Sequence, residues 1–468
     1  MNTALIVDLG IIALLVVGIG RFRTPRGARF GNHAAALALV AAIVVVLVRT
    51  GVTQPWVVAL ACAAGSLAGL AMAFRASMTS IPSVVAFQHG MGGVAAVLVS
   101  AIELTGAKSA TAVGALSGLF GLILGAATFS ASLLAAAKLG NYMKQMPTQV
   151  RGHNAILAVL LLVVVVLADR YRVATTPMIP VVGIVVVAAV FGALFAARIG
   201  GADMPVLISL LNATAGLAAA FCGVTIENRL LIVAGATVAS SGSILTIMMC
   251  RAMNRSLANI FFGGPIATTS RAAPPPIPSE PARPPAITSR EDRVDAVVTA
   301  ALGARKVVVV PGYGMALAQA QGEVVRLGKL LETRGMEVRY AIHPVAGRMP
   351  GHMNVLLAEA DVDYEKLLEI DDANTAFPDT DLVLVVGACD VVNPAALEVE
   401  GTPLSGMPIL MAHQARAIAV CNLDEKPGYS GVANPLYRSE RTHMLLGDAL
   451  QTIIDLRTRI EARSGSAT

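Results

Sequence analysis

The sequence is poor in charged residues, aromatic residues and cysteine. Of its 468 residues, 14% are charged, 4% are aromatic and 55% are hydrophobic. This composition excludes an ordinary soluble globular chain and is typical of a membrane protein. The five cysteines, at positions 62, 222, 250, 389 and 421, form no Cys-x-x-Cys pair. We therefore expect small buried hydrophobic residues there, not a disulfide framework or a zinc site.

Acidic residues are especially scarce in the first part of the chain. Up to Phe262 there are five acids against sixteen Lys or Arg, whereas the remainder has 25 acids and 19 bases. The first part is thus +11 and the rest is −6. The overall charge of +5 therefore indicates a membrane topology and not a nucleic-acid-binding surface.

Long apolar runs fill the first part, and a helix needs about 20 apolar residues to cross a bilayer. Nine segments qualify and predict a transmembrane domain over residues 1–262. They run roughly over 3–20, 34–50, 55–74, 82–102, 109–137, 155–169, 177–197, 205–223 and 229–250.

Basic residues are unevenly shared between the two sets of alternate loops. One set holds eleven and the other five, and the richer side is predicted to be cytoplasmic. This places the N-terminus outside and everything after Arg251 inside. The eleven are Arg21, Arg23, Arg26, Arg29, Arg75, Lys138, Lys144, Arg151, Arg198, Arg251 and Arg255, and the five are Arg49, Lys108, Arg170, Arg172 and Arg229.

The second part of the chain has a different pattern. Residues 263–293 are rich in Pro, Ala and Ser and predict a linker. Residues 294–468 then alternate buried strand runs with a helical stretch over 315–335, which predicts a soluble α/β domain with a doubly wound parallel sheet. The predicted strands are "KVVVVPG" (306–312), "MEVRYAIHP" (336–344), "DLVLVVGA" (381–388), "PILMA" (408–412) and "AIAVCN" (417–422).

A glycine pair marks the first strand-to-helix turn, in "PGYGMALAQAQ". Gly312 and Gly314 stand where a Rossmann-type turn lets the backbone and a helix N-terminus approach a pyrophosphate. The third fingerprint position is Leu317 instead of Gly or Ala, which departs from the dinucleotide fingerprint. No acid follows the second strand, and this absence disfavours NAD and permits a 2′-phosphate. A tight turn without a ligand is the alternative.

Three further stretches are polar and rich in glycine. They are "HPVAGRMPGHMN" (343–354), "GACDVVNPAA" (387–396) and "KPGYSGVANPLY" (426–437). The second follows a predicted strand, at the end where ligands bind in such sheets. The third has the composition of a loop that could close over a ligand.

In these stretches the chain resembles the beta subunit of proton-translocating NAD(P) transhydrogenase. "GGADMP" (200–205) and "RAMNRS" (251–256) extend the resemblance to the membrane part. The resemblance implies a Rossmann-type NADP(H)-binding domain and a proton channel in a bacterial inner membrane. It also implies an alpha subunit with an NAD(H)-binding domain and further transmembrane helices, in a dimer of alpha–beta units.

The same resemblance implies which residues contact the nucleotide. One departure concerns the Lys-Arg-Ser triplet that the family often has for the 2′-phosphate, because Asn422, Leu423 and Asp424 stand there. Lys426 is then the nearest base. The candidate residues are Gly312, Tyr313, Gly314, Met315, Ala316, Val345, Ala346, Gly347, Arg348, Gly387, Ala388, Asp390, Asn393, Lys426, Gly428 and Tyr429.

Polar residues within the apolar spans are candidates for proton transfer. His89 lies in the fourth span, and histidine gains and loses a proton near neutral pH. Asn212 lies in the eighth span, and Asp203 stands where that span begins. The alternatives are a neutral histidine and an asparagine that each bind a neighbouring helix, and a solvated helix start. The resemblance implies that His89 and Asn212 line the proton path.

Two functions of different classes fit these features. The first is a transhydrogenase beta subunit, in which hydride passes between two nicotinamides while protons move inward. The second is an ion transporter gated by a nucleotide-sensing Rossmann domain. Such a transporter should have convergent carboxylates at mid-membrane, and the spans of this sequence have none. The first function is therefore favoured.

Overall fold

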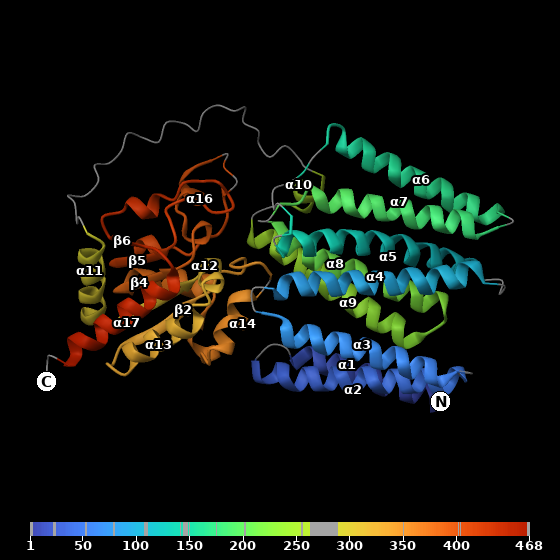
Figure 1. The fold of residues 1–468 in the computed structure, drawn as a ribbon, viewed down its shortest axis with the longest axis horizontal. Coiled ribbons are helices and arrows are strands. Elements are labelled where there is room, and N and C mark those ends of the chain that lie inside the picture. The colour runs from blue at the N-terminus through green and yellow to red at the C-terminus, as the bar shows by residue number, and fades with distance from the viewer. Residues whose placement is uncertain are drawn as a thin grey trace. The chain divides into compact units, whose positions relative to one another are not determined.

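The computed structural model has two compact units, Met1–Ile247 and Met248–Thr468 (Figure 1). The predicted linker over 263–293 lies outside the described residues as far as position 288 and stays a prediction. The structure describes residues 3–21, 25–51, 54–77, 80–106, 111–140, 142–143, 148, 150–174, 176–200, 203–253, 256–262, 289–349, 351–400, 402 and 404–465.

Long helices make up the described part of the first unit. Eight of them are long and apolar enough to cross a membrane. The predicted span over 155–169 forms α6, which is not among the eight and carries Asp169, Arg170 and Arg172 near its end. The helices are α1 (Thr3–Gly20), α2 (Pro25–Thr50), α3 (Pro55–Arg75), α4 (Ile81–Thr105), α5 (Ala112–Leu139), α6 (His153–Val173), α7 (Met178–Ala197), α8 (Met204–Thr225) and α9 (Arg229–Ala252), which runs on into the second unit.

Glycines allow the central helices of this bundle to pack closely. A Cβ on Gly93 of α4 would lie 2.6 Å from the carbonyl oxygen of Gly125 in α5. A Cβ on Gly125 would lie 2.7 Å from the carbonyl oxygen of Gly93. Such small-residue contacts are typical of membrane helices, where van der Waals packing replaces the hydrophobic effect. The α4–α5 contact therefore depends on these two glycines.

An ion pair between a buried carboxylate and an exposed arginine joins α1 and α2. Asp8 is 4% exposed, and its Oδ1 lies 2.8 Å from Nη1 of Arg49. Arg49 also donates to the carbonyl oxygen of Ala4 (2.9 Å). A carboxylate in an apolar helix is costly unless it is paired, so Arg49 makes Asp8 tolerable there.

The second unit is built on a six-stranded, all-parallel sheet in the order β3-β2-β1-β4-β5-β6. This is the strand order of a doubly wound Rossmann fold, with a reversal between β1 and β4. The predicted fold class is thus confirmed. The strands are β1 (Lys306–Pro311), β2 (Glu337–Ala341), β3 (Leu367–Leu368), β4 (Leu382–Val386), β5 (Ala417–Asn422) and β6 (Thr442–Leu446).

The central strands are buried on both faces, as their continuous apolar runs predict. One face packs on Phe377, which is fully buried among Val308, Val383 and Ile418. The helical segments of this unit are α10 (Leu257–Phe262), α11 (Arg290–Gly303), α12 (Tyr313–Leu317), α13 (Gln321–Glu332), α14 (His352–Glu359), η3 (Tyr364–Lys366), α15 (Ile370–Ala376), η4 (Phe377–Asp379), η5 (Asp390–Val392), α16 (Ala395–Glu398), η6 (Ala412–Gln414), η7 (Pro435–Arg438) and α17 (Ala449–Gly465).

The sequence prediction was wrong about some elements of this unit. The single helix expected over 315–335 is broken into α12 and α13, because Gln319 takes a positive φ of 53°. The predicted strand over 408–412 is a buried extended segment whose Leu410 N–H donates to Val391 instead of to a strand. The strands β3 and β6 were not predicted.

We predict that Gly93→Val destabilises the helical unit by about 1–3 kcal/mol, because the added side chain overlaps the α5 backbone. Gly92→Val is the matched control, since nothing lies within 4 Å of a Cβ at Gly92. Thermal unfolding of both variants in detergent checks this. Equal melting temperatures for the two would contradict the packing assigned to Gly93.

Candidate functional site

The candidate nucleotide site lies at the carboxyl ends of β1 and β4. The strand order reverses between these two neighbours, and in doubly wound sheets such a switch point is where the ligand-binding crevice forms. The loops after β1, β2, β4 and β5 all start at this edge of the sheet. They carry most of the residues that the sequence singled out.

Three glycines bring the turns after β1 and β4 into backbone contact. Gly312 N–H donates to the carbonyl oxygen of Val386 and Gly314 N–H donates to that of Gly387, both at 2.8 Å. A Cβ on Gly312 would overlap the Gly387 carbonyl, and Gly387 itself has φ +66°. The amides of Gly312 and Gly314 thus hold the two turns together and are not left free for a phosphate.

Arg348 and two tyrosines gather beside this contact. The guanidinium carbon of Arg348 lies 4.4 Å from the ring centre of Tyr313, a cation–π distance. Its Nη2 donates to the hydroxyl of Tyr429 at 3.5 Å. Burial raises the pKa of Tyr313, against the opposing effect of the Arg348 charge. Loops that are far apart in sequence therefore place a cation over one aromatic ring and beside the hydroxyl of a second tyrosine.

A buried histidine shapes the turn that carries Arg348. The Nδ1 of His343 accepts from Val345 N–H (3.2 Å), and its Nε2 lies 2.7 Å from the carbonyl oxygen of Pro408. The turn continues through Ala346, whose N–H donates to His343, and through Gly347 at φ +107°. Burial lowers the pKa of His343 to about 4, so the ring is neutral and donates from Nε2.

Asp390 joins the loop 387–396 to the loop 426–437. Its two carboxylate oxygens accept from the Ser430 hydroxyl (2.7 Å) and the Ser430 N–H (3.0 Å). Gly428 packs on the same carboxylate, since a Cβ there would lie 2.7 Å from Oδ2. Asn393 donates to the carbonyl oxygens of Val432 (3.4 Å) and Ala433 (3.2 Å). The second loop is thus held against the first.

Three other residues that the sequence predicted to contact the nucleotide are either buried or already paired with an acid. Met315 and Ala316 are buried, so only their backbone could face a ligand. Lys426 is 83% exposed at its side chain, and its Nζ lies 3.2 Å from Oδ2 of Asp424. The base predicted to hold a 2′-phosphate therefore already has an acidic partner.

Sequence reasoning missed a buried polar pair beside the site. Nδ2 of Asn422 donates to the Ala388 carbonyl oxygen and to the Tyr437 hydroxyl, both at 2.9 Å. Oδ1 of Asn422 is buried and has no hydrogen-bond partner in the described part of the chain. In the sequence, Asn422 stands where the family often has the lysine of the Lys-Arg-Ser triplet. No sequence pattern indicated its contacts with Ala388 and Tyr437.

The candidate proton-pathway residues lie in helices that pack on one another. His89 is in α4 and Asn212 is in α8, and both side chains are partly buried. Neither forms a hydrogen bond with any residue that the structure describes, so the helix-binding alternatives gain no support. Asp203 is the N-cap residue of α8, although its side chain does not cap the helix. Among the described residues, no group of His, Cys, Asp and Glu could hold a metal ion.

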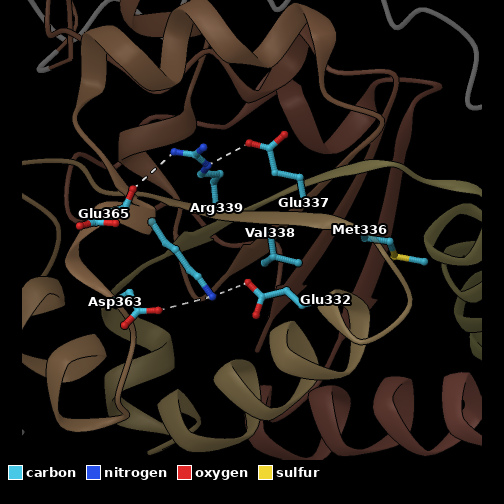
Figure 2. Close-up of a pocket in the computed structure, with 8 residues that line it drawn as sticks. Glu332, Met336, Glu337, Val338, Arg339, Asp363 and Glu365 are labelled. Atoms are coloured by element: carbon cyan, nitrogen blue, oxygen red, sulfur yellow. Dashed lines mark hydrogen bonds and ion pairs between the residues drawn. The ribbon is translucent and has the colours of Figure 1, made fainter.

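A separate cavity of about 410 Å³ lies at the opposite edge of the sheet, where β2 begins (Figure 2). Its charges are largely paired: Lys366 contacts Glu332 (2.7 Å) and Arg339 contacts Glu337 (3.0 Å). It is remote from the glycine turns, and we assign it no part in nucleotide binding.

Comparison with known proteins covers both units. Residues 5–459 match the family model for the NAD(P) transhydrogenase beta subunit. The chain belongs to this family. It is 40% identical over 453 residues to the NAD(P) transhydrogenase subunit beta of Rhodospirillum rubrum, across 93% of this chain and 94% of the relative. The same protein from strain ATCC 11170 of that organism gives the same values.

Family membership favours the transhydrogenase function over the gated ion transporter. It indicates nicotinamide nucleotide chemistry and an alpha-subunit partner for this beta-subunit homologue. The eight apolar helices agree with a membrane protein.

We predict that acid weakens the C-terminal unit through His343. Its folded-state pKa of about 4 lies below the ordinary 6.5, so stability is full above pH 6.5 and falls as the pH drops towards 4. The loss by pH 4.5 should reach about 2–3 kcal/mol. Amide hydrogen exchange of β1 and β4 in the detergent-solubilised chain measures it.

His343→Gln serves as the non-titrating control. Burial lowers the pKa of His413 and His443 as well, so the relevant quantity is the difference in pH dependence between wild type and variant. An identical pH dependence for both proteins would rule out His343 as the source.

Proposed function

We propose that this chain binds NADP(H) in its C-terminal unit and carries protons through its helical unit. Hydride would pass to or from NAD(H) on an alpha subunit: NADH + NADP⁺ + H⁺(out) ⇌ NAD⁺ + NADPH + H⁺(in). Support comes from one chain that joins a glycine-lined switch-point crevice to apolar helices carrying His89 and Asn212. The family match covers both parts.

The residues at the crevice suit a dinucleotide. The buried Oδ1 of Asn422 lacks a donor among the described residues, and a ribose hydroxyl would supply one. The guanidinium of Arg348 suits a phosphate, because its planar fork matches phosphate oxygens. The bound nicotinamide would supply the hydride chemistry, and this chain would position it and exclude water.

The protein's own residues would have three tasks in this mechanism. Arg348 would balance phosphate charge. Asp390 would keep the loop 426–437 in place over the crevice through Ser430. In the helical unit His89 would take up and release the proton, with Asn212 beside the path and Asp203 at the start of α8. One proton contributes about 2.3 kcal/mol per 100 mV, enough to shift the equilibrium one to two orders of magnitude.

The second nucleotide would come from another polypeptide. Direct hydride transfer needs the reacting atoms about 3–3.5 Å apart, hence two dinucleotide sites that meet. The described chain has one parallel sheet and one strand–Gly-x-Gly–helix turn, at Gly312 and Gly314. We therefore propose an alpha subunit with an NAD(H) site and further membrane helices, in a dimer of alpha–beta units. The proposed location is a bacterial inner membrane, with the N-terminus outside and the C-terminal unit in the cytoplasm.

We predict that the full chain in detergent binds NADP(H) at least about tenfold tighter than NAD(H), since no acid follows β2 to bind a 2′-hydroxyl. Lys426→Gln should reduce this ratio if Lys426 exchanges Asp424 for the 2′-phosphate. Lys329→Gln, an exposed lysine of α13, is the control of equal charge change. Calorimetric titration that gives equal or reversed affinities in the wild type would refute the NADP(H) assignment.

We predict that His89→Ala abolishes proton movement coupled to hydride transfer but leaves the protein folded and inserted. Asn212→Ala should weaken coupling less, because water can replace an amide. The measurement is NADPH-to-NAD-analogue turnover in vesicles containing both subunits, with the internal pH recorded. The chain alone should bind nucleotide and show negligible turnover.

Two outcomes would count against these assignments. Wild-type pumping by both variants would remove His89 and Asn212 from the proton path. Full turnover by the chain without an alpha subunit would show that it holds a second nucleotide site.

A further inference from the structure

Two buried basic side chains lie where α5, α6 and α7 meet at one end of the bundle. Lys138, in the last turn of α5, is 3% exposed and donates to the carbonyl oxygens of Ala197 (2.7 Å) and Ile199 (2.8 Å). Arg198, directly after α7, is 6% exposed and donates to Oδ1 of Asn154 in α6 (2.7 Å). These bonds bring the end of α5, the start of α6 and the end of α7 together.

No carboxylate balances these two charges in the described part of the chain. The carbonyls at the end of α7 suit the ammonium of Lys138, because a helix C-terminus is partly negative. Arg198 has only a neutral amide oxygen, although its guanidinium can donate five hydrogen bonds. The sequence from 138 to 203 contains two acids, Asp169 at the far end of α6 and Asp203 at the start of α8, and neither forms a described ion pair with Lys138 or Arg198. A buried cation normally requires an anionic partner, so one is missing here.

A histidine at the start of α6 independently indicates a ligand. His153 is the first residue of α6 and is 7% exposed. Both of its ring nitrogens are buried and have no hydrogen-bond partner among the described residues. Gly152 precedes it at φ +74°, and no side chain caps this helix, so its first N–H groups lack side-chain acceptors. Imidazole, guanidinium and a helix N-terminus all favour the same kind of ligand, an anion with several oxygens.

We propose that the ends of α5, α6 and α7 form a binding site for the phosphate group of an anionic phospholipid. A lipid is favoured over a soluble anion because α5 and α7 have the length and composition to cross a membrane, so their ends lie at the headgroup level. Around the site Tyr142 (87%), Val150 (54%) and Val159 (58%) are exposed. Exposed apolar side chains beside a basic cluster suit acyl chains below a phosphate.

The test uses the full chain in nanodiscs that contain equal amounts of phosphatidylglycerol and phosphatidylcholine. After mild delipidation, mass spectrometry measures the lipids that stay bound. Wild type should retain phosphatidylglycerol with an enrichment of about fivefold or more, as expected for one basic group near the phosphate. Arg198→Gln should remove this enrichment, and Arg198→Lys should keep part of it.

Arg151→Gln is the matched control, because Arg151 is exposed at the same end of the bundle and the charge change is equal. It should keep most of the enrichment. Equal losses for Arg151→Gln and Arg198→Gln would overturn the site in favour of general surface charge. So would a wild type without preference for phosphatidylglycerol.

Two further arms complete the test. If inorganic phosphate at millimolar concentration displaces the lipid and protects the detergent-solubilised chain equally well, the ligand is a free anion and the lipid proposal fails. If Arg198→Gln does not fold, as judged by helix content and size-exclusion profile, His153→Gln decides. Lower enrichment for His153→Gln supports the site, and unchanged enrichment overturns it.

Discussion

The candidate nucleotide site depends on one backbone contact, between the turns after β1 and β4. Gly387 has a left-handed backbone conformation, and a Cβ there would overlap the backbone nitrogen of Met315. No larger residue therefore fits at this position. The contact sets the distance between the loop that carries Tyr313 and the loop that carries Asp390. Asp390 in turn holds Ser430 and thereby the loop 426–437. A methyl group at Gly312 or Gly387 would thus disturb several loops at once.

In the helical unit, close packing fixes two helices against each other. Gly93 and Gly125 bring α4 and α5 together, so the helix that carries His89 is fixed against its neighbour. Packing of this kind leaves little freedom for rotation of α4, while His89 itself makes no hydrogen bond to the described residues. A titratable group on a rigid helix without a protein partner can exchange protons with water, as the proposed pathway requires.

The sequence predicted well where one physical signal dominates. Continuous apolar runs located β1, β4 and β5, because strands buried on both faces admit few polar residues. It failed where tertiary contacts decide. The left-handed Gln319 splits a helix that local propensity would continue, and the 408–412 segment binds loops instead of a strand. For the site, glycine turns located the loops, but the Tyr313–Arg348 contact joins residues whose proximity only the fold creates.

The proposed coupling allows the energy of the bonds at Asp390 to be compared with the work of a proton. Hydrogen bonds to a charged group contribute about 1.5–3 kcal/mol each, and Ser430 gives Asp390 two of them. One proton that crosses the membrane supplies about 2.3 kcal/mol per 100 mV. Releasing the loop 426–437 from Asp390 therefore costs an amount of the same order as the work of one or two protons. In the proposed mechanism, much stronger bonds would hold the nucleotide in place, and much weaker ones would let it exchange without proton movement. Because Asn393 and Asn434 also join the two loops, the bonds at Asp390 are one part of the contact that the proposed mechanism would have to break to release the nucleotide.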